Sequence, residues 1–165
     1  MIVVLMLEPL QLSNQGDIMN LHDTFTPTGE LEIVLRDSQG NIKETRKAKN
    51  LVVSAGKTYL ASRAVGTSAN IMSHMAIGTA TSTPTAGDTT LGTEAGRVTL
   101  ASASNSANAI TYTATFPAGT GTGAITEAAV LNSSSGGTML CRTTFPVVNK
   151  AAGDSIAVTW VVTIS

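Results

Sequence analysis

The sequence predicts an all-β, mainly antiparallel fold: a two-sheet β-sandwich or jelly-roll-like domain with one short helix and an N-terminal arm. Three observations predict this class. The C-terminal run alternates in polarity, the 165-residue chain is only 13% charged, and turn signals recur roughly every eight to twelve residues, as in sandwiches and barrels. We expect the arm over residues 1–28 and the β-sandwich domain over residues 29–165.

The C-terminal segment 155–164 carries the clearest periodic signal. Side chains alternate between the two faces of a strand, and here one parity is wholly apolar: Ile156, Val158, Trp160, Val162 and Ile164. The other parity holds small or β-branched residues, which suit a half-covered sheet surface. We therefore expect a central strand, with Trp160 in the core.

Shorter runs of β-forming residues predict the other strands. With the C-terminal strand they give about eight or nine, the number typical of a two-sheet antiparallel fold. Thr-Phe-Pro occurs at two strand ends, where Pro117 and Pro146 should stop strand pairing. The main expected strands are Leu31–Arg36, Ile42–Lys47, Ile71–Ile77, Arg97–Ala103, Ala109–Phe116, Ala124–Leu131 and Met139–Phe145.

One substantial helix is expected, over Ala55–Val65. Ser54 is a residue type that caps helix N-termini, and Gly66 is suited to end the helix in the left-handed conformation.

A long loop is expected between Gly78 and Gly92, where the chain is rich in Thr, Ala, Ser, Pro and Gly. Loops of this length in a compact domain are commonly functional or lie against a partner. We take five of its residues as candidate interface residues: Thr79, Thr81, Thr83, Pro84 and Asp88.

The N-terminal arm begins with an apolar run that predicts either a short strand or translated sequence upstream of a start at Met19. No basic residue precedes the run and no small-residue cleavage site follows Pro9, so it does not resemble a signal peptide. Our hypothesis is that the arm adds a strand to a neighbouring subunit or lies in a groove on one. Its candidate interface residues are Ile2, Val3, Val4, Leu5, Met6 and Leu7.

Basic residues cluster in the first half of the chain. Six of the ten lie between positions 43 and 63, with Glu44 as the only acid among them. We favour a solvated strand-and-turn face; the alternative is a docking patch for an acidic partner, with Arg46, Lys47 and Lys49 as candidates. Because the net charge is −1 and no apolar stretch approaches the length of a membrane span, we expect neither nucleic acid nor membrane as a partner.

No arrangement of residues predicts catalysis or cofactor binding. The single cysteine, Cys141, lies in an apolar run and is expected in the core. Two histidines and scattered carboxylates give no metal-ligand spacing. Gly56-Lys57-Thr58 lacks the preceding glycine of a phosphate-binding loop, since position 51 is Leu. We therefore expect no metal or cofactor and no enzymatic activity.

Five segments carry a resemblance that covers Asn50 to Ser165. They are Asn50–Lys57, Ser73–Gly78, Ala86–Glu94, Ile125–Ala128 and Phe145–Lys150. In pattern and order this part of the chain resembles a family of small virion structural proteins of tailed bacteriophages. The resemblance implies a virion part assembled in the bacterial host cytoplasm, and it brings no catalytic motif.

Three functions follow as hypotheses. The first is a capsid decoration or cement protein that bridges major capsid subunits as a homotrimer. The second is a neck, collar or tail-fibre module that attaches to another virion protein and contacts the host surface. The third, a carbohydrate-binding β-sandwich, is disfavoured because the chain is only 4% aromatic and sugar platforms need exposed aromatic rings.

Overall fold

The computed structural model describes residues 26–66 and 69–165. Within these ranges it contains nine strands and one helix. In chain order they are β1 (Thr28–Arg36), β2 (Ile42–Val52), α1 (Ser54–Ala64), β3 (His74–Gly78), β4 (Glu94–Thr99), β5 (Ser102–Ser106), β6 (Ala109–Phe116), β7 (Gly123–Leu131), β8 (Met139–Lys150) and β9 (Ser155–Thr163).

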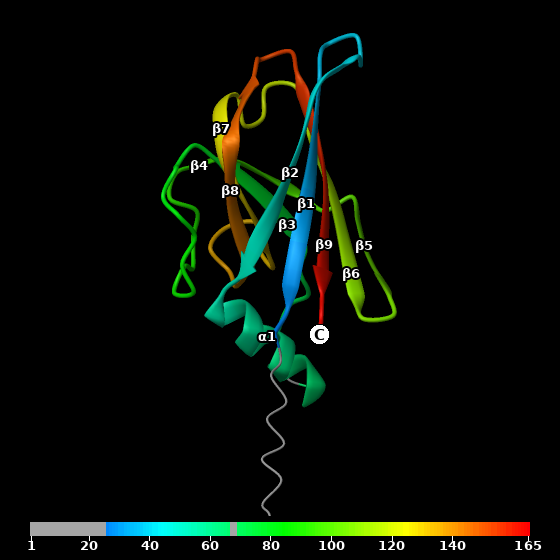
Figure 1. Cartoon of the computed structure of the whole chain (residues 1–165), viewed down its shortest axis with the longest axis vertical. Helices are drawn as coiled ribbons and strands as arrows, with labels where there is room; N and C mark the ends of the chain where they lie inside the picture. Colours follow the sequence, from blue (N-terminus) through cyan, green and yellow to red (C-terminus); the bar gives the residue numbers. More distant parts are fainter. Residues whose placement is uncertain (1–25, 67–68) are drawn as a thin grey trace, which may run out of the picture.

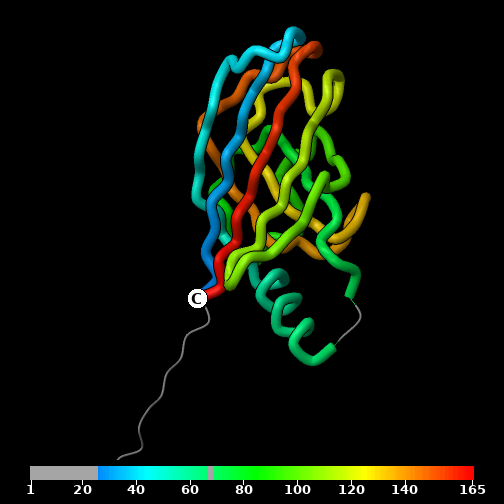
Figure 2. Tube along the Cα trace, turned by 90° about the vertical axis from the view of Figure 1, so that its right-hand side faces the viewer, coloured from blue at the N-terminus to red at the C-terminus, as the bar shows by residue number. Residues whose placement is uncertain are grey.

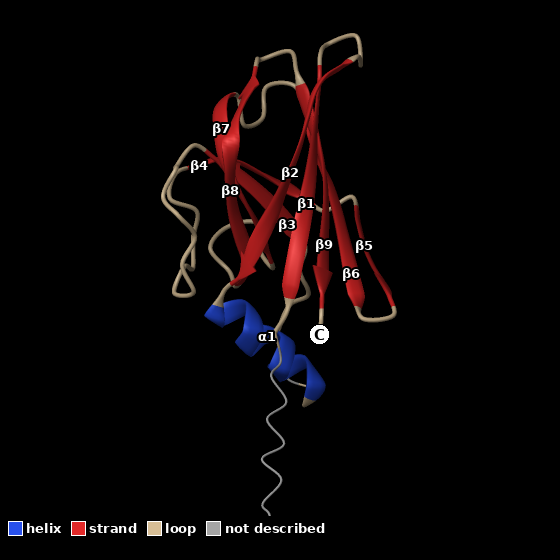
Figure 3. Ribbon diagram, in the orientation of Figure 1, coloured by secondary structure: helices blue, strands red, loops and turns tan. Residues whose placement is uncertain are grey.

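All the strands belong to one antiparallel sheet, in the order β4-β3-β7-β8-β2-β1-β9-β6-β5. The helix α1 lies across one end of the sheet (Figure 3). The C-terminal strand β9 is an interior strand. It pairs with β1 along its whole length on one side and with β6 along most of its length on the other. The prediction of a central C-terminal strand is therefore confirmed.

The sheet curls strongly upon itself. The edge strands β4 and β5 are joined by only two residues, Leu100 and Ala101. The N–H of Leu100 donates to Ser73 O next to β3, and the N–H of Ala101 donates to Thr113 O on β6, so the connection spans the two ends of the strand order. In Figure 2 the half formed by β1, β9 and β6 lies in front of β7 and β8. The structure confirms the antiparallel all-β class but is a half-barrel made from one sheet; it does not confirm a two-sheet sandwich or jelly roll.

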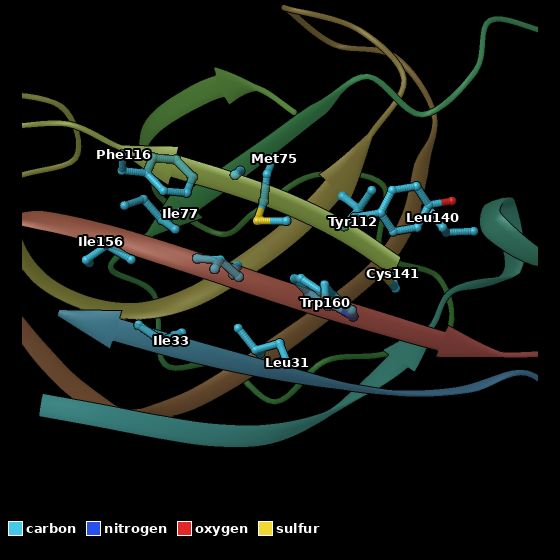
Figure 4. Packing of buried hydrophobic residues seen from close by; sticks show 14 of the residues in the cluster. Leu31, Ile33, Met75, Ile77, Tyr112, Phe116, Leu140, Cys141, Ile156 and Trp160 are labelled. Carbon is cyan, nitrogen blue, oxygen red and sulfur yellow. The ribbon is translucent and has the colours of Figure 1, made fainter. Parts of the chain in front are cut away.

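The main core lies inside this curl. Leu31 and Ile33 from β1 face Trp160 from β9 and Met75 from β3 (Figure 4). Trp160 is fully buried, and so is Cys141, whose burial raises the pKa of its thiol. Both residues are core residues, as the sequence predicted, and Trp160 offers no surface to a sugar.

A second, smaller cluster lies on the outer face of β3, β7 and β8. It contains Val53, Ala76, Leu91, Ala129, Leu131 and Met139. These three strands are therefore covered on both faces, which explains why β3 and β7 are apolar at both parities.

Several predicted strand boundaries were wrong: β2 runs to Val52 and not only to Lys47, and β3 begins at His74 and not at Ile71. The strand β8 continues through Pro146 to Lys150, because a bulge opposite Ile125–Glu127 takes Pro146 out of the regular pairing. The expected strand Arg97–Ala103 is two strands, since the chain crosses from one sheet edge to the other at Leu100–Ala101. Pro117 does end β6, as predicted.

The predicted helix is present, but its expected cap was wrong. Val53 is the N-cap, without a side-chain hydrogen bond, and Ser54 is already helical. The N–H of Val53 instead donates to Leu140 O on β8. Gly66 has a positive φ of 71°, as expected for a residue that ends a helix.

The helix packs closely on β8 through Gly56. A Cβ built on Gly56 would lie 2.0 Å from Leu140 O, a backbone atom that cannot move away without disturbing the strand. Glycine is unfavourable inside a helix, so this close approach accounts for its presence.

Gly56→Ala is expected to lower the free energy of unfolding by about 1–3 kcal/mol, the usual range for overpacking. Gly87→Ala is the matched control, because no atom lies within 4 Å of a Cβ added there; its effect should stay within about 0.5 kcal/mol. Urea unfolding of both variants tests this, and equal stabilities would contradict the close packing.

Candidate functional site

The 79–93 loop lies against the outer face of β3, β7 and β8, at the left in Figure 1. Its two ends meet where Thr79 N–H donates to Thr93 O at 2.9 Å, and its middle is held by Ser54 N–H, which donates to Ala86 O at 2.8 Å. Leu91 is buried in the outer apolar cluster. The predicted loop is therefore present, and it is attached to the sheet at both its ends and its centre.

A buried arginine makes the main polar contacts beneath this loop. Arg142 on β8 donates from Nη2 and Nε to Glu127 Oε2, at 2.8 and 3.1 Å. Its Nη1 donates to Asp88 Oδ2 at 2.6 Å, and its Nη2 also reaches the carbonyl and hydroxyl oxygens of Ser82. We call Arg142, Glu127, Asp88 and Ser82 the Arg142 network. It links two sheet strands to two positions in the loop.

Glu127 on β7 binds the loop backbone directly. Its Oε1 accepts hydrogen bonds from Thr93 N–H at 2.8 Å and Ala80 N–H at 3.1 Å, and its Oε2 accepts one from Gly92 N–H at 3.0 Å. These bonds satisfy N–H groups that the closed loop could not pair internally. One carboxylate therefore fixes both ends of the loop.

The strand register brings the two charged residues together. Glu127 lies opposite Thr144 and Ala129 lies opposite Arg142, so Glu127 and Arg142 are diagonal neighbours on one face of the β7–β8 pair. Gly78 allows the close approach of the carboxylate, because a Cβ there would lie 2.5 Å from Glu127 Oε1.

The electrostatics of the network favour the charged forms. Burial alone would raise the pKa of Glu127, but the N–H groups of Thr93, Gly92 and Ala80 together with Arg142 outweigh it and hold the pKa below its ordinary value of 4.5. Burial likewise opposes ionisation of Asp88, and its hydrogen bonds from Thr85 and Arg142 keep its pKa lowered. Both carboxylates are ionised at neutral pH.

The predicted loop residues fall into two groups. Thr81 and Thr83 are exposed, whereas Thr79 and Pro84 are half-buried. Asp88 is half-buried and belongs to the Arg142 network, so it holds the loop in place. The arm candidates Ile2, Val3, Val4, Leu5, Met6 and Leu7 lie outside the described residues.

The basic candidates Arg46, Lys47 and Lys49 are exposed on β2. The register places Lys47 opposite Glu32 and Lys49 opposite Glu30 on β1, and Arg46 forms an ion pair with Glu44. Directly opposed charges on neighbouring strands attract each other. This arrangement favours a solvated face over a docking patch for an acidic partner.

The sequence analysis did not select Glu127 or Arg142 as candidates, although a signal was present. Glu127 lies within the run Ala124–Leu131, which is otherwise apolar at nearly every position. Arg142 directly follows the apolar run Met139–Cys141. Charges are rarely buried unless they are paired. One opposite charge in each of two neighbouring apolar strands could therefore have predicted an ion pair between Glu127 and Arg142.

The described residues contain no group of three or more His, Cys, Asp or Glu side chains placed to hold a metal ion. In the same part of the chain, no helix combines the length and apolar character needed to cross a membrane. The site can present a loop surface of fixed shape, on which Thr81 and Thr83 are exposed and beneath which the Arg142 network is buried.

Arg142→Met is expected to lower the free energy of unfolding by about 3–5 kcal/mol, because it leaves the buried Glu127 carboxylate without its cation. Arg46→Met is the matched control: its ion pair with Glu44 is partly exposed, so the loss should stay below about 1 kcal/mol. Chemical denaturation measures both. Similar losses for the two variants would contradict an anchoring role for Arg142.

Stability should also fall in acid. Because the folded-state pKa of Glu127 is lowered, its contribution is fully present above the unfolded value near 4.5 and is lost as pH falls through the folded value. Glu127→Gln should lower the free energy of unfolding at pH 7 and make its decline in acid less steep. Part of the decline should remain, because the pKa of Asp88 is also lowered. Denaturation from pH 7 to acid tests this, and parallel profiles for variant and wild type would refute it.

Comparisons with known proteins return no match: no protein-family model matches this chain, and neither do curated proteins or solved structures.

Proposed function

We propose that this chain is a non-enzymatic virion structural protein of a tailed bacteriophage, and that it acts as a capsid decoration or cement protein. In this role it forms a homotrimer on the shell and bridges major capsid subunits. The segments between Asn50 and Lys150 that resemble phage virion proteins suggest the class. The geometry of the 79–93 loop suggests how such a protein would make contact.

One observation carries the proposal: the loop is fixed by buried charges while Thr81 and Thr83 remain exposed. A partner that binds Thr81 and Thr83 finds a surface already ordered by the Arg142 network. Ordering a flexible loop would cost free energy on binding, and a preformed loop avoids most of this cost. A fixed contact surface suits a subunit that must occupy many equivalent positions on a lattice.

The surface chemistry also supports an assembly role. Basic residues on β2 lie opposite acidic residues on β1, and the outer face of β9 presents Ala157, Thr159 and Val161, which are exposed or half-buried and uncharged. A surface of this kind can approach a neighbour without desolvating unpaired charges.

Mechanistically, each loop contact is weak, and three loops on a trimer act together. Once one subunit is bound, the others bind at a high effective concentration, so total affinity greatly exceeds that of a single contact. Bridging several shell subunits in this way resists the outward pressure of packaged DNA.

The experiment measures the number of copies bound per particle. Particles assembled without this chain are mixed with purified protein, washed and quantified by mass spectrometry. We expect on the order of hundreds of copies, following the repeated symmetry of a shell. The T81K/T83K double variant should bind at least tenfold less, about 1.4 kcal/mol per site, because two lysines replace the neutral contact residues.

The matched control is T45K/T159K, which adds the same charge at exposed positions on β2 and β9. It should bind like wild type. About a dozen copies per particle would favour the neck, collar or tail-fibre role, since those parts follow the lower symmetry of the tail. Equal binding of the two double variants would show that the 79–93 loop is not the contact surface.

A further inference from the structure

An apolar furrow lies between α1 and the β5–β6 hairpin. It has a volume of about 370 Å³ and is lined mainly by Tyr59 from α1, Ile71 and Met72 before β3, and Ile110 and Tyr112 from β6. A second hollow of about 370 Å³ shares Ile71, Met72 and Ala103 with it and extends to Leu100. We call the two together the β5 furrow.

The β5 furrow exposes groups that a folded chain normally covers. The side chain of Ile71 is 64% exposed. Along the furrow runs β5, an edge strand that pairs only with β6 among the described residues. An unpaired strand edge beside apolar side chains is the usual binding site for an added extended segment, which supplies backbone hydrogen bonds and alternate side chains.

The described chain begins close to this furrow. Thr26 N–H donates to Ser165 O, and Ile164 N–H donates to Asn108 O in the turn between β5 and β6. Figure 1 shows the C-terminus and the β5–β6 turn at the same end of the sheet, next to α1. Any segment that precedes Thr26 therefore starts at the end of the molecule where the furrow opens.

We propose that the apolar segment Met1–Leu7 of the same chain binds along β5 and covers the β5 furrow. The segment is apolar at every position, so either parity of an added strand can fill the furrow. Residues 8–25 can span up to about 60 Å when extended, more than enough to reach β5 from Thr26.

The occupant is the chain's own segment because the attachment point is adjacent. A linker of this length holds the segment at an effective concentration in the millimolar range, so binding within one chain precedes binding between copies at ordinary protein concentrations. The added strand would also protect the β5 edge from pairing with other molecules. This proposal does not depend on the virion role.

Cross-linking in the full-length protein tests it. Val4→Cys is combined with Ala103→Cys on β5, and a short bis-maleimide is added to dilute protein. Ala103 is exposed, so the substitution should not disturb folding, and the native Cys141 is fully buried and does not react. We expect a cross-link within one chain, at least tenfold more than for the control pair Val4→Cys with Thr83→Cys. Thr83 belongs to the 79–93 loop, and Figure 1 shows this loop and β5 on opposite sides of the molecule.

A third substitution shows whether the furrow itself holds the segment. Ile71→Asp places a charge in the furrow at an exposed position, and it should reduce the cross-link with Ala103→Cys about tenfold while the protein remains folded. A cross-link that is unaffected by Ile71→Asp would overturn the furrow as the binding site. Cross-linked dimers would overturn the same-chain assignment in favour of a second copy, and equal yields from the Ala103 and Thr83 pairs would overturn the proposal as a whole.

Discussion

The buried ion pair between Arg142 and Glu127 joins two strands of the sheet to the loop that covers their outer face. Five hydrogen-bond contacts from the guanidinium and three backbone bonds to the carboxylate connect β7 and β8 to the 79–93 loop. Burying two charges is expensive, and complete hydrogen bonding is what makes it tolerable. The outer apolar cluster, the loop surface and the covered faces of three strands all depend on this arrangement.

The loop gains its fixed shape from charge more than from apolar contact. Leu91 is the only loop side chain in the outer cluster of described residues, while backbone N–H groups at both ends of the loop bind one carboxylate. A loop held by directional bonds keeps one conformation, whereas a loop held by apolar contact alone could repack. Function at Thr81 and Thr83 would therefore depend on residues that no partner touches.

The sequence predicted the features that depend on local pattern. Alternation predicted β9 and the buried Trp160, and glycine chemistry predicted that α1 ends just before Gly66. It could not predict features that depend on register or closure. The Glu127–Arg142 contact requires the β7–β8 register, including a bulge next to Ile125. Likewise, alternation shows which face of a strand is buried but not whether two halves belong to one sheet, so the half-barrel was missed.

The two-residue connection between β4 and β5 has a mechanical consequence. It ties the two edges of the sheet together covalently, so the sheet cannot flatten by separating its edges. Most neighbouring strands pair over five or more residues, but β2 and β8 pair only through Leu51–Arg142 and Val52–Cys141. The half-barrel therefore has a built-in hinge line: any opening that leaves the chain connections intact breaks the fewest hydrogen bonds along the seam between β2 and β8.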